Sequence, residues 1–180
     1  MRRGILLALM IPLLLCSCAG EREEERLNIL RDAIEGGTVT FSADITMQWE
    51  DTFFACSEEV VWKDGELSAS LTAPDTLVGI SYHTGEENTL EYDGVILSLG
   101  KGIGSPSPAE AAPRMMAALT EGRLLYTGSD RDTWFAVLAE DTGDSVNITF
   151  SRENDTPLYC EIIRDGAVVL SLRVTDWKTV

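Results

Sequence analysis

The sequence predicts a mainly β protein, built from a meander of antiparallel strands that each have one apolar face. Two observations carry this prediction. Apolar and polar residues alternate along many short segments, and this period of two places one face of a strand against a core. Polar turns such as Asp64-Gly65 and Asp93-Gly94 separate those segments, and Asp-Gly favours the positive φ angles of tight hairpins.

The first 17 residues are typical of an export signal. Arg2 and Arg3 precede an apolar run at residues 5–15 that is too short to span a bilayer. The segment Leu15-Cys16-Ser17-Cys18 resembles the lipobox of bacterial lipoproteins, which implies that Cys18 is lipidated and becomes the mature N-terminus. The alternative is an ordinary secreted protein with incidental cysteines. Residues 1–17 are therefore a predicted signal peptide and residues 18–26 a lipidated tether, followed by one domain over residues 27–180.

The segment EREEER at 21–26 is too charged to pack, so the tether is expected to lift the domain off the membrane. A short amphipathic helix follows, since Leu27, Leu30 and Ile34 recur at helical spacing. Gly36-Gly37 ends it. We expect this helix to pack on its own domain.

About six strands follow, and the clearest is the first, where six apolar residues occupy every second position from Val39 to Trp49. Glycines and prolines then interrupt the strands at 100–108. The segment 109–119 is rich in helix-forming residues and predicts a helix. About five more strands complete the chain. The predicted strands cover residues 39–49, 54–62, 67–71, 78–82, 90–92, 95–99, 124–127, 133–139, 145–150, 158–163 and 167–176.

Composition excludes several classes of function. The formal net charge is −16 and the isoelectric point is near 4.3. The chain therefore lacks the basic surface that a protein needs to bind nucleic acid or anionic lipid. His83 is the only histidine, which excludes a histidine-based zinc cluster. No nucleophile motif or phosphate loop stands out. We expect a monomer that is not an enzyme and has no cofactor.

The order of elements resembles the family of the periplasmic lipoprotein carrier and its outer-membrane receptor (LolA/LolB-like proteins). The resemblance covers residues 27–180 and rests on that order, on strand–turn–strand segments such as Glu91-Tyr92-Asp93-Gly94-Val95-Ile96-Leu97, and on the closing pattern Val168-Leu170-Leu172-Val174. It implies a strongly curved antiparallel sheet of about 10–11 strands that forms an unclosed barrel with a helical lid. In that family a characteristic arginine locks the lid, and Arg114 is the nearest candidate for this arginine in the present sequence.

Such a sheet would offer a concave apolar lining for an acyl chain or another amphiphile. The alternative is that the same residues fill a closed core. The predicted lining residues are Phe41, Ile45, Met47, Trp49, Phe54, Glu58, Val60, Trp62, Met115 and Met116.

Two features of the strands leave alternatives open. If the strand at 54–62 is regular, Glu58 points to the apolar side and could contact a ligand head group or hold the lid. A bulge there would instead send it to water. Cys56 and Cys160 both fall on apolar strand faces, where they are either a disulfide or two separate buried thiols.

Two functions fit these observations. The first is an exported, membrane-anchored lipoprotein on the outer face of a bacterial cell membrane or at the outer membrane. It binds a lipid, a lipoprotein or another apolar ligand. The second is a scaffold of the same fold that docks or activates a cell-envelope enzyme. Spore-germination lipoproteins that resemble this fold and activate a cell-wall amidase are its precedent.

Overall fold

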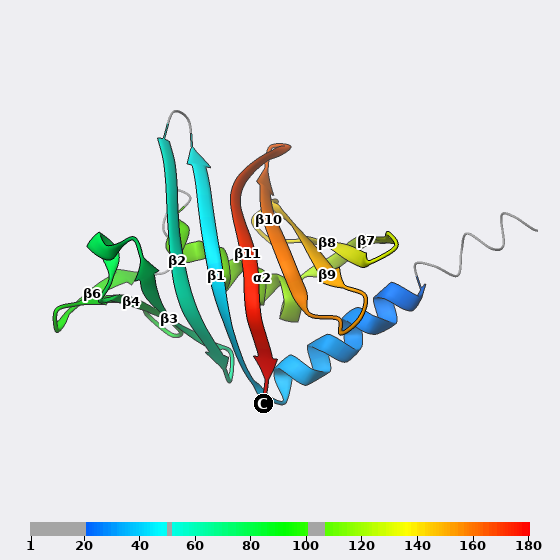
Figure 1. Ribbon diagram of the computed structural model, residues 1–180, viewed down its shortest axis with the longest axis horizontal. Coiled ribbons are helices and arrows are strands. Elements are labelled where there is room, and N and C mark those ends of the chain that lie inside the picture. Colours follow the sequence, from blue (N-terminus) through cyan, green and yellow to red (C-terminus); the bar gives the residue numbers. More distant parts are fainter. Residues whose placement is uncertain (1–20, 50–51, 101–106) are drawn as a thin grey trace, which may run out of the picture.

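The computed structural model describes residues 21–49, 52–100 and 107–180, and a single antiparallel sheet of eleven strands dominates it (Figure 1). The strand order is β6-β5-β4-β3-β2-β1-β11-β10-β9-β8-β7. All strands pair with a neighbour in sequence except at the centre, where β1 pairs with β11. The strands are β1 (Thr38–Trp49), β2 (Thr52–Lys63), β3 (Glu66–Ala73), β4 (Ile80–Thr84), β5 (Asn88–Tyr92), β6 (Val95–Gly100), β7 (Arg123–Ser129), β8 (Thr133–Ala139), β9 (Ser145–Ser151), β10 (Pro157–Arg164) and β11 (Ala167–Thr179).

The sheet is not closed into a barrel, because β6 and β7 form its two edges and do not pair with each other. Its long central strands stand between two wings, β3–β6 on one side and β7–β9 on the other (Figure 1). The predicted fold class and strand number are therefore confirmed.

The Asp-Gly turns have the geometry that the sequence predicts. Asp64 and Asp93 have φ angles of 54° and 50°, and the glycines that follow them have φ angles of 83° and 76°. Positive φ at both central residues is the signature of the type I′ turn, whose twist matches that of the strands it joins. These turns fix the register of the β2–β3 and β5–β6 hairpins.

The predicted alternation of β1 is confirmed where its side chains are described. Val39, Phe41, Ala43 and Ile45 are buried, and they define the inner face of the sheet. The helix α2 (Ala111–Glu121) and the short η2 (Pro108–Glu110) that precedes it lie across this face. They cover the predicted helix at 109–119.

The N-terminal helix begins earlier than the sequence led us to expect. Residues 21–35 are helical, so the segment 21–26 continues the helix where a free tether was expected. Glu23 is buried, and Arg26 contacts Asp155 beyond β9 with 2.6 Å between Nη1 and Oδ1. Glu23 and Arg26 pack because oppositely charged partners, Arg152 and Asp155, lie in the turn after β9, whereas the other four residues of the segment are exposed. Cys18 and the predicted signal peptide lie outside the described residues.

Candidate functional site

The space between α2 and the sheet is filled by side chains. Met115, Met116 and Leu119 of α2 have no exposed surface and pack in one core with the inner-face residues of the strands. The N-terminal helix adds Leu27, Leu30 and Ile34 to that core, as its apolar spacing predicts.

Most of the predicted lining residues belong to this core. Met47 and Phe54 are partly buried against it, and Trp49 belongs to β1 but its side chain lies outside the described part of the chain. Of the predicted residues, only Trp62 also lines a described pocket, a shallow one of about 370 Å³. Ligand contact by the whole set stays a prediction. The members that belong to the buried core are Phe41, Ile45, Val60, Trp62, Met115 and Met116.

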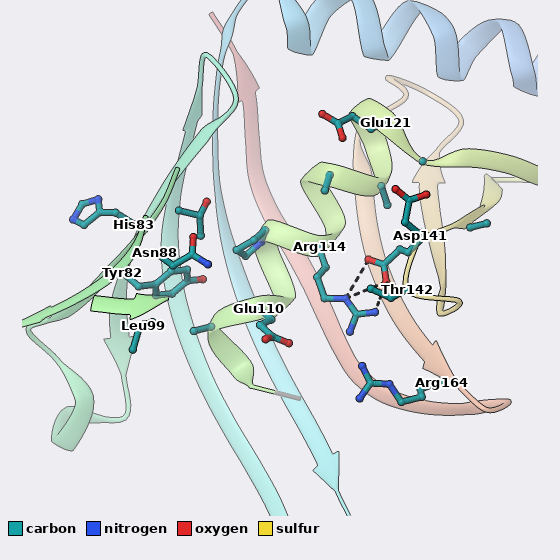
Figure 2. A pocket seen from close by; sticks show the side chains of 18 of the residues that line it. Tyr82, His83, Asn88, Leu99, Glu110, Arg114, Glu121, Asp141, Thr142 and Arg164 are labelled. Atoms are coloured by element: carbon teal, nitrogen blue, oxygen red, sulfur yellow. Dashed lines mark hydrogen bonds and ion pairs between the residues drawn. The ribbon is translucent and has the colours of Figure 1, made fainter. Parts of the chain in front are cut away.

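A larger cleft of about 550 Å³ lies on the far side of α2, away from the core. In Figure 2, α2 forms its floor, Tyr82 and Leu99 stand on one wall, and Asp141 and Thr142 stand on the other. Each wall therefore comes from a different wing of the sheet. Figure 2 also shows the ring of His83 turned away from α2, where Ser68 binds its Nδ1.

Apolar side chains and charged side chains both line this cleft. Its apolar lining is Tyr82, Leu99, Ala109, Pro113, Ala117, Ala118 and Ala139. Its charged lining is Glu110, Arg114, Glu121, Arg123, Glu140, Asp141 and Arg164. A molecule with an apolar body and a polar head matches such a lining in chemical character.

Arg114 joins the floor of the cleft to its wall. Its Nε donates to Glu140 Oε1 at 3.1 Å and its Nη2 to Asp144 Oδ2 at 2.7 Å. Arg164 donates to the same Asp144 oxygen at 2.9 Å. Burial raises the pKa of Asp144, but hydrogen bonds from Arg164 and Arg114 outweigh burial and hold its pKa below the usual value. Arg114 was singled out from the sequence, but nothing there indicated that this arginine contacts Asp144.

Glu58 is buried beside the opposite wall, as a regular strand predicts. Its Oε2 accepts a 2.6 Å hydrogen bond from the Tyr82 hydroxyl, and its Oε1 has no hydrogen-bond partner among the described residues. Burial raises the pKa of Glu58 to about 7, although the bond from Tyr82 acts to lower it. The bulge alternative is wrong for this carboxylate. The register between β1 and β2 runs unbroken, and the irregularity at Ser57 and Glu58 is confined to the pairing with β3.

Cys56 and Cys160 are free, buried thiols, so the disulfide alternative is not realised in this structure. The register explains why. Cys56 lies opposite Ile45, Ile45 opposite Leu172, and Leu172 opposite Cys160. Two strands therefore separate the thiols, and neighbouring strands are about 5 Å apart. A disulfide needs Cα atoms within about 7 Å.

Two further features of the described residues bear on function. Across 21–49, 52–100 and 107–180, no three His, Cys, Asp or Glu side chains gather closely enough to hold a metal ion. No helix in the same ranges combines the length and the apolar character needed to cross a membrane.

No protein-family model and no curated protein sequence matches the chain. Solved structures do match it. One from Vibrio parahaemolyticus, described as an outer membrane lipoprotein-sorting protein domain, is 10% identical with a TM-score of 0.50, over 85% of this chain and 90% of that one. An uncharacterised conserved protein from Thermus thermophilus is 14% identical with a TM-score of 0.53, over 88% of both chains. A LolA superfamily protein from Nitrosomonas europaea is 14% identical with a TM-score of 0.47, over 84% of this chain and 91% of that one.

The first two of these similarities define the class of fold, an open antiparallel barrel with helices on its inner face. More particularly, the fold of this chain is LolA-like, as the order of its elements led us to expect.

Proposed function

We propose that this protein is a non-enzymatic lipoprotein of the bacterial cell envelope that binds a lipid, a lipoprotein or another apolar ligand. The observation that carries this proposal is the 550 Å³ cleft over α2. The core beneath α2 is filled, so the ligand occupies the outer side of α2. Alanines and a proline provide contact surface for an acyl chain there, and the arginines of the lining provide charge for a head group.

The fold supports the same proposal, because a lipoprotein-sorting domain is among the structures that share it. The leader supports export and anchoring. Its lipobox-like segment ends at Cys18, and two acyl signals would hold the domain stably at a membrane. Cys18→Ser is expected to remove the lipid mass from the purified protein and to release the protein from the membrane fraction. A lipid mass that persists in Cys18→Ser would contradict the anchor.

Ligand binding is tested by filling the cleft. Ala117 lies on the exposed side of α2 and lines the cleft, so Ala117→Trp places an indole ring where the ligand would lie. Native mass spectrometry is expected to detect a lipid-sized adduct on the full-length protein and to lose it in the variant.

Ala55→Trp is the matched control for this experiment. Ala55 is exposed on β2 at a position that alternates with the buried Cys56, so its side chain points to the outer face. This control is expected to keep the adduct. A protein without an adduct in every form, even after incubation with phospholipid vesicles, would overturn the proposal.

A second function, the docking of an envelope protein, is favoured by a different observation. The β6 edge of the sheet exposes consecutive apolar side chains outside the cleft. This alternative, which includes the activation of an envelope enzyme such as a cell-wall amidase, rests on that edge.

A further inference from the structure

The wing formed by β3–β6 has a charge unlike the rest of the chain. Residues 64–100 contain no lysine and no arginine, although the whole chain has 14 of them. All but one of the acidic residues in this range are exposed, and Glu91 is half-buried. The wing is therefore a uniformly negative surface. Its acidic residues are Asp64, Glu66, Asp75, Glu86, Glu87, Glu91 and Asp93.

The end of this wing is also apolar. On β6, Val95 is 59% exposed and Leu97 is 54% exposed, and on β5 Tyr92 is 52% exposed. Large apolar side chains exposed next to one another mark an interaction site more often than scattered ones do.

These side chains lie on the inner face and continue the wall of the cleft. Tyr92 lies opposite Val95, and Leu90 lies opposite both Leu97 and Tyr82. Tyr82 itself lines the cleft, as does Leu99 at the far end of β6. An apolar strip thus runs along β5 and β6 from the cleft to the end of the wing.

The strip borders a free strand edge. Within the described residues, β6 pairs with β5 on one side and with no strand on the other. The outer backbone N–H and C=O groups of an edge strand are a template for a further strand from another chain. Strand β6 contains neither lysine nor proline, the two residues that often block such pairing.

We propose that the free edge of β6 and its apolar strip dock an extended, basic and apolar polypeptide segment of a partner protein. The backbone of the segment would add a strand to the sheet. Its apolar side chains would pack on Val95 and Leu97, and its lysines or arginines would lie on the other face of the sheet, where they would reach across β6 toward Glu91 and toward Asp93 in the β5–β6 turn. The inference deepens the second of the proposed functions by naming the chemistry of the partner. It does not depend on a ligand in the cleft.

Charge is what selects this occupant. A second copy of the chain would bring one acidic wing against another, and an anionic membrane would meet the same repulsion. A basic segment would be attracted by the acidic side chains of the wing, and its backbone would form hydrogen bonds with the free edge of β6. We therefore expect binding that weakens with salt, because the charges involved are exposed.

The test uses the full-length protein and a synthetic peptide of about eight residues that alternates lysine with valine, a length typical of one strand. Fluorescence anisotropy of the labelled peptide measures its Kd. A peptide with glutamate in place of lysine is the control for charge. Leu97→Lys is expected to weaken binding about tenfold, because it places a charge at the centre of the contact. The pair Glu91→Gln and Asp93→Asn is expected to weaken binding about threefold and to reduce its salt dependence.

Leu125→Lys is the matched control variant. Leu125 is 44% exposed on β7, the other edge of the same sheet, where Arg123 and Arg131 interrupt the acidic surface. This variant is expected to bind the basic peptide as the unaltered protein does, and thermal unfolding checks that both variants fold.

Equal binding of the acidic and basic peptides would overturn the proposal, as would equal loss in the two Leu→Lys variants. Self-association of the protein would also overturn the proposal if Leu97→Lys abolished that self-association. Binding of anionic phosphatidylglycerol vesicles at the same edge would overturn it as well. A lipid adduct in the cleft is measured separately, so either function can fail alone.

Discussion

The Tyr82 hydroxyl donates a hydrogen bond of 2.6 Å to the carboxylate of Glu58, between a residue that lines the cleft and one buried behind it. Burial raises the pKa of Glu58 to about 7, from an ordinary value of 4.5. Burial also raises the pKa of Tyr82, and the negative charge of Glu58 raises it further. A proton on Glu58 is therefore stabilising in the folded protein.

The first prediction concerns the pH dependence of stability that Glu58 causes. Below pH 4.5 the carboxyl group is protonated in both folded and unfolded chains. Between pH 4.5 and about 7 the unfolded chain loses this proton while the folded chain keeps it, so the free energy of unfolding falls as pH rises. The whole loss is on the order of 3 kcal/mol and is complete above pH 7. Glu58→Gln is expected to remove this dependence in urea unfolding from pH 5 to 9.

Tyr82→Phe is the second variant for this pair. It removes the hydrogen bond that lowers the Glu58 pKa, so the fall in stability is expected to move to higher pH. Above pH 7 it is expected to cost about 1–3 kcal/mol, because a buried carboxylate loses its partner. If the unfolding free energies of Glu58→Gln and of the unaltered protein fell in parallel from pH 5 to 9, Glu58 would not be the cause of the pH dependence.

The second prediction concerns the ion pairs of Arg114 at the opposite wall. Arg114→Leu leaves Glu140 and the buried Asp144 without the guanidinium that links them to α2. Since Arg164 still pairs with Asp144, we expect a loss of about 1–3 kcal/mol in the free energy of unfolding. A double-mutant cycle with Asp144→Asn measures the coupling.

Arg123→Leu is the control for this prediction. Arg123 lines the same cleft but is exposed and makes no ion pair within the described ranges. Its replacement is expected to change stability by less than about 0.5 kcal/mol. Equal losses for Arg114→Leu and Arg123→Leu would mean that the ion pairs contribute nothing measurable.

The sequence predicted those parts of the fold that local periodicity determines. The alternation from Val39 to Ile45 places each side chain on its observed face, because a strand has a period of two whatever its partners. The Asp-Gly turns were predictable for the same local reason. The pairing of β1 with β11, which joins the two halves of the sheet, has no local signal in the sequence and was not predicted.

The candidate site was less predictable, because its contacts join distant residues. The inward direction of Glu58 follows from the register, but its partner Tyr82 is 24 residues away and two strands along the sheet. Arg114 meets Asp144 only because α2 crosses the sheet beside the β8–β9 turn. The predicted lining residues formed a packed core because α2 fills the inner face, and periodicity does not distinguish a filled interior from an empty one.

The third prediction concerns the two thiols. Burial and the charge of Glu58 raise the pKa of Cys56 to about 12, and burial raises the pKa of Cys160 further. Neither thiol forms the reactive thiolate at neutral pH. We expect iodoacetamide to modify both thiols in denaturant and neither in the native protein, as read by intact mass.

Ser98→Cys is the control variant. It adds an exposed thiol on β6 that is expected to react at once, which shows that the reagent is active. A native mass lower by the two hydrogens of a disulfide would contradict the separation of these strands.

The last prediction concerns the contact that holds the N-terminal helix on the sheet. Asp155 Oδ1 accepts hydrogen bonds from Arg26 Nη1 at 2.6 Å and from Trp134 Nε1 at 2.8 Å. Trp134 has no exposed surface and stacks on Phe150, with ring centroids 4.0 Å apart. Asp155→Ala leaves the indole N–H without this acceptor and places alanine at a φ of 57°, so we expect a loss of about 2–4 kcal/mol.

Asp155→Asn separates the ion pair from the other two effects. Asparagine keeps an acceptor for Trp134 and tolerates positive φ, so its cost should be that of a partly exposed ion pair, up to about 1 kcal/mol. Arg26→Ala is expected to cost about the same, because it removes the same pair from the other side. Urea unfolding measured by tryptophan fluorescence ranks the three variants. If Asp155→Asn were as damaging as Asp155→Ala, the charge and not the indole bond would dominate this contact, and the N-terminal helix would then be released by high salt.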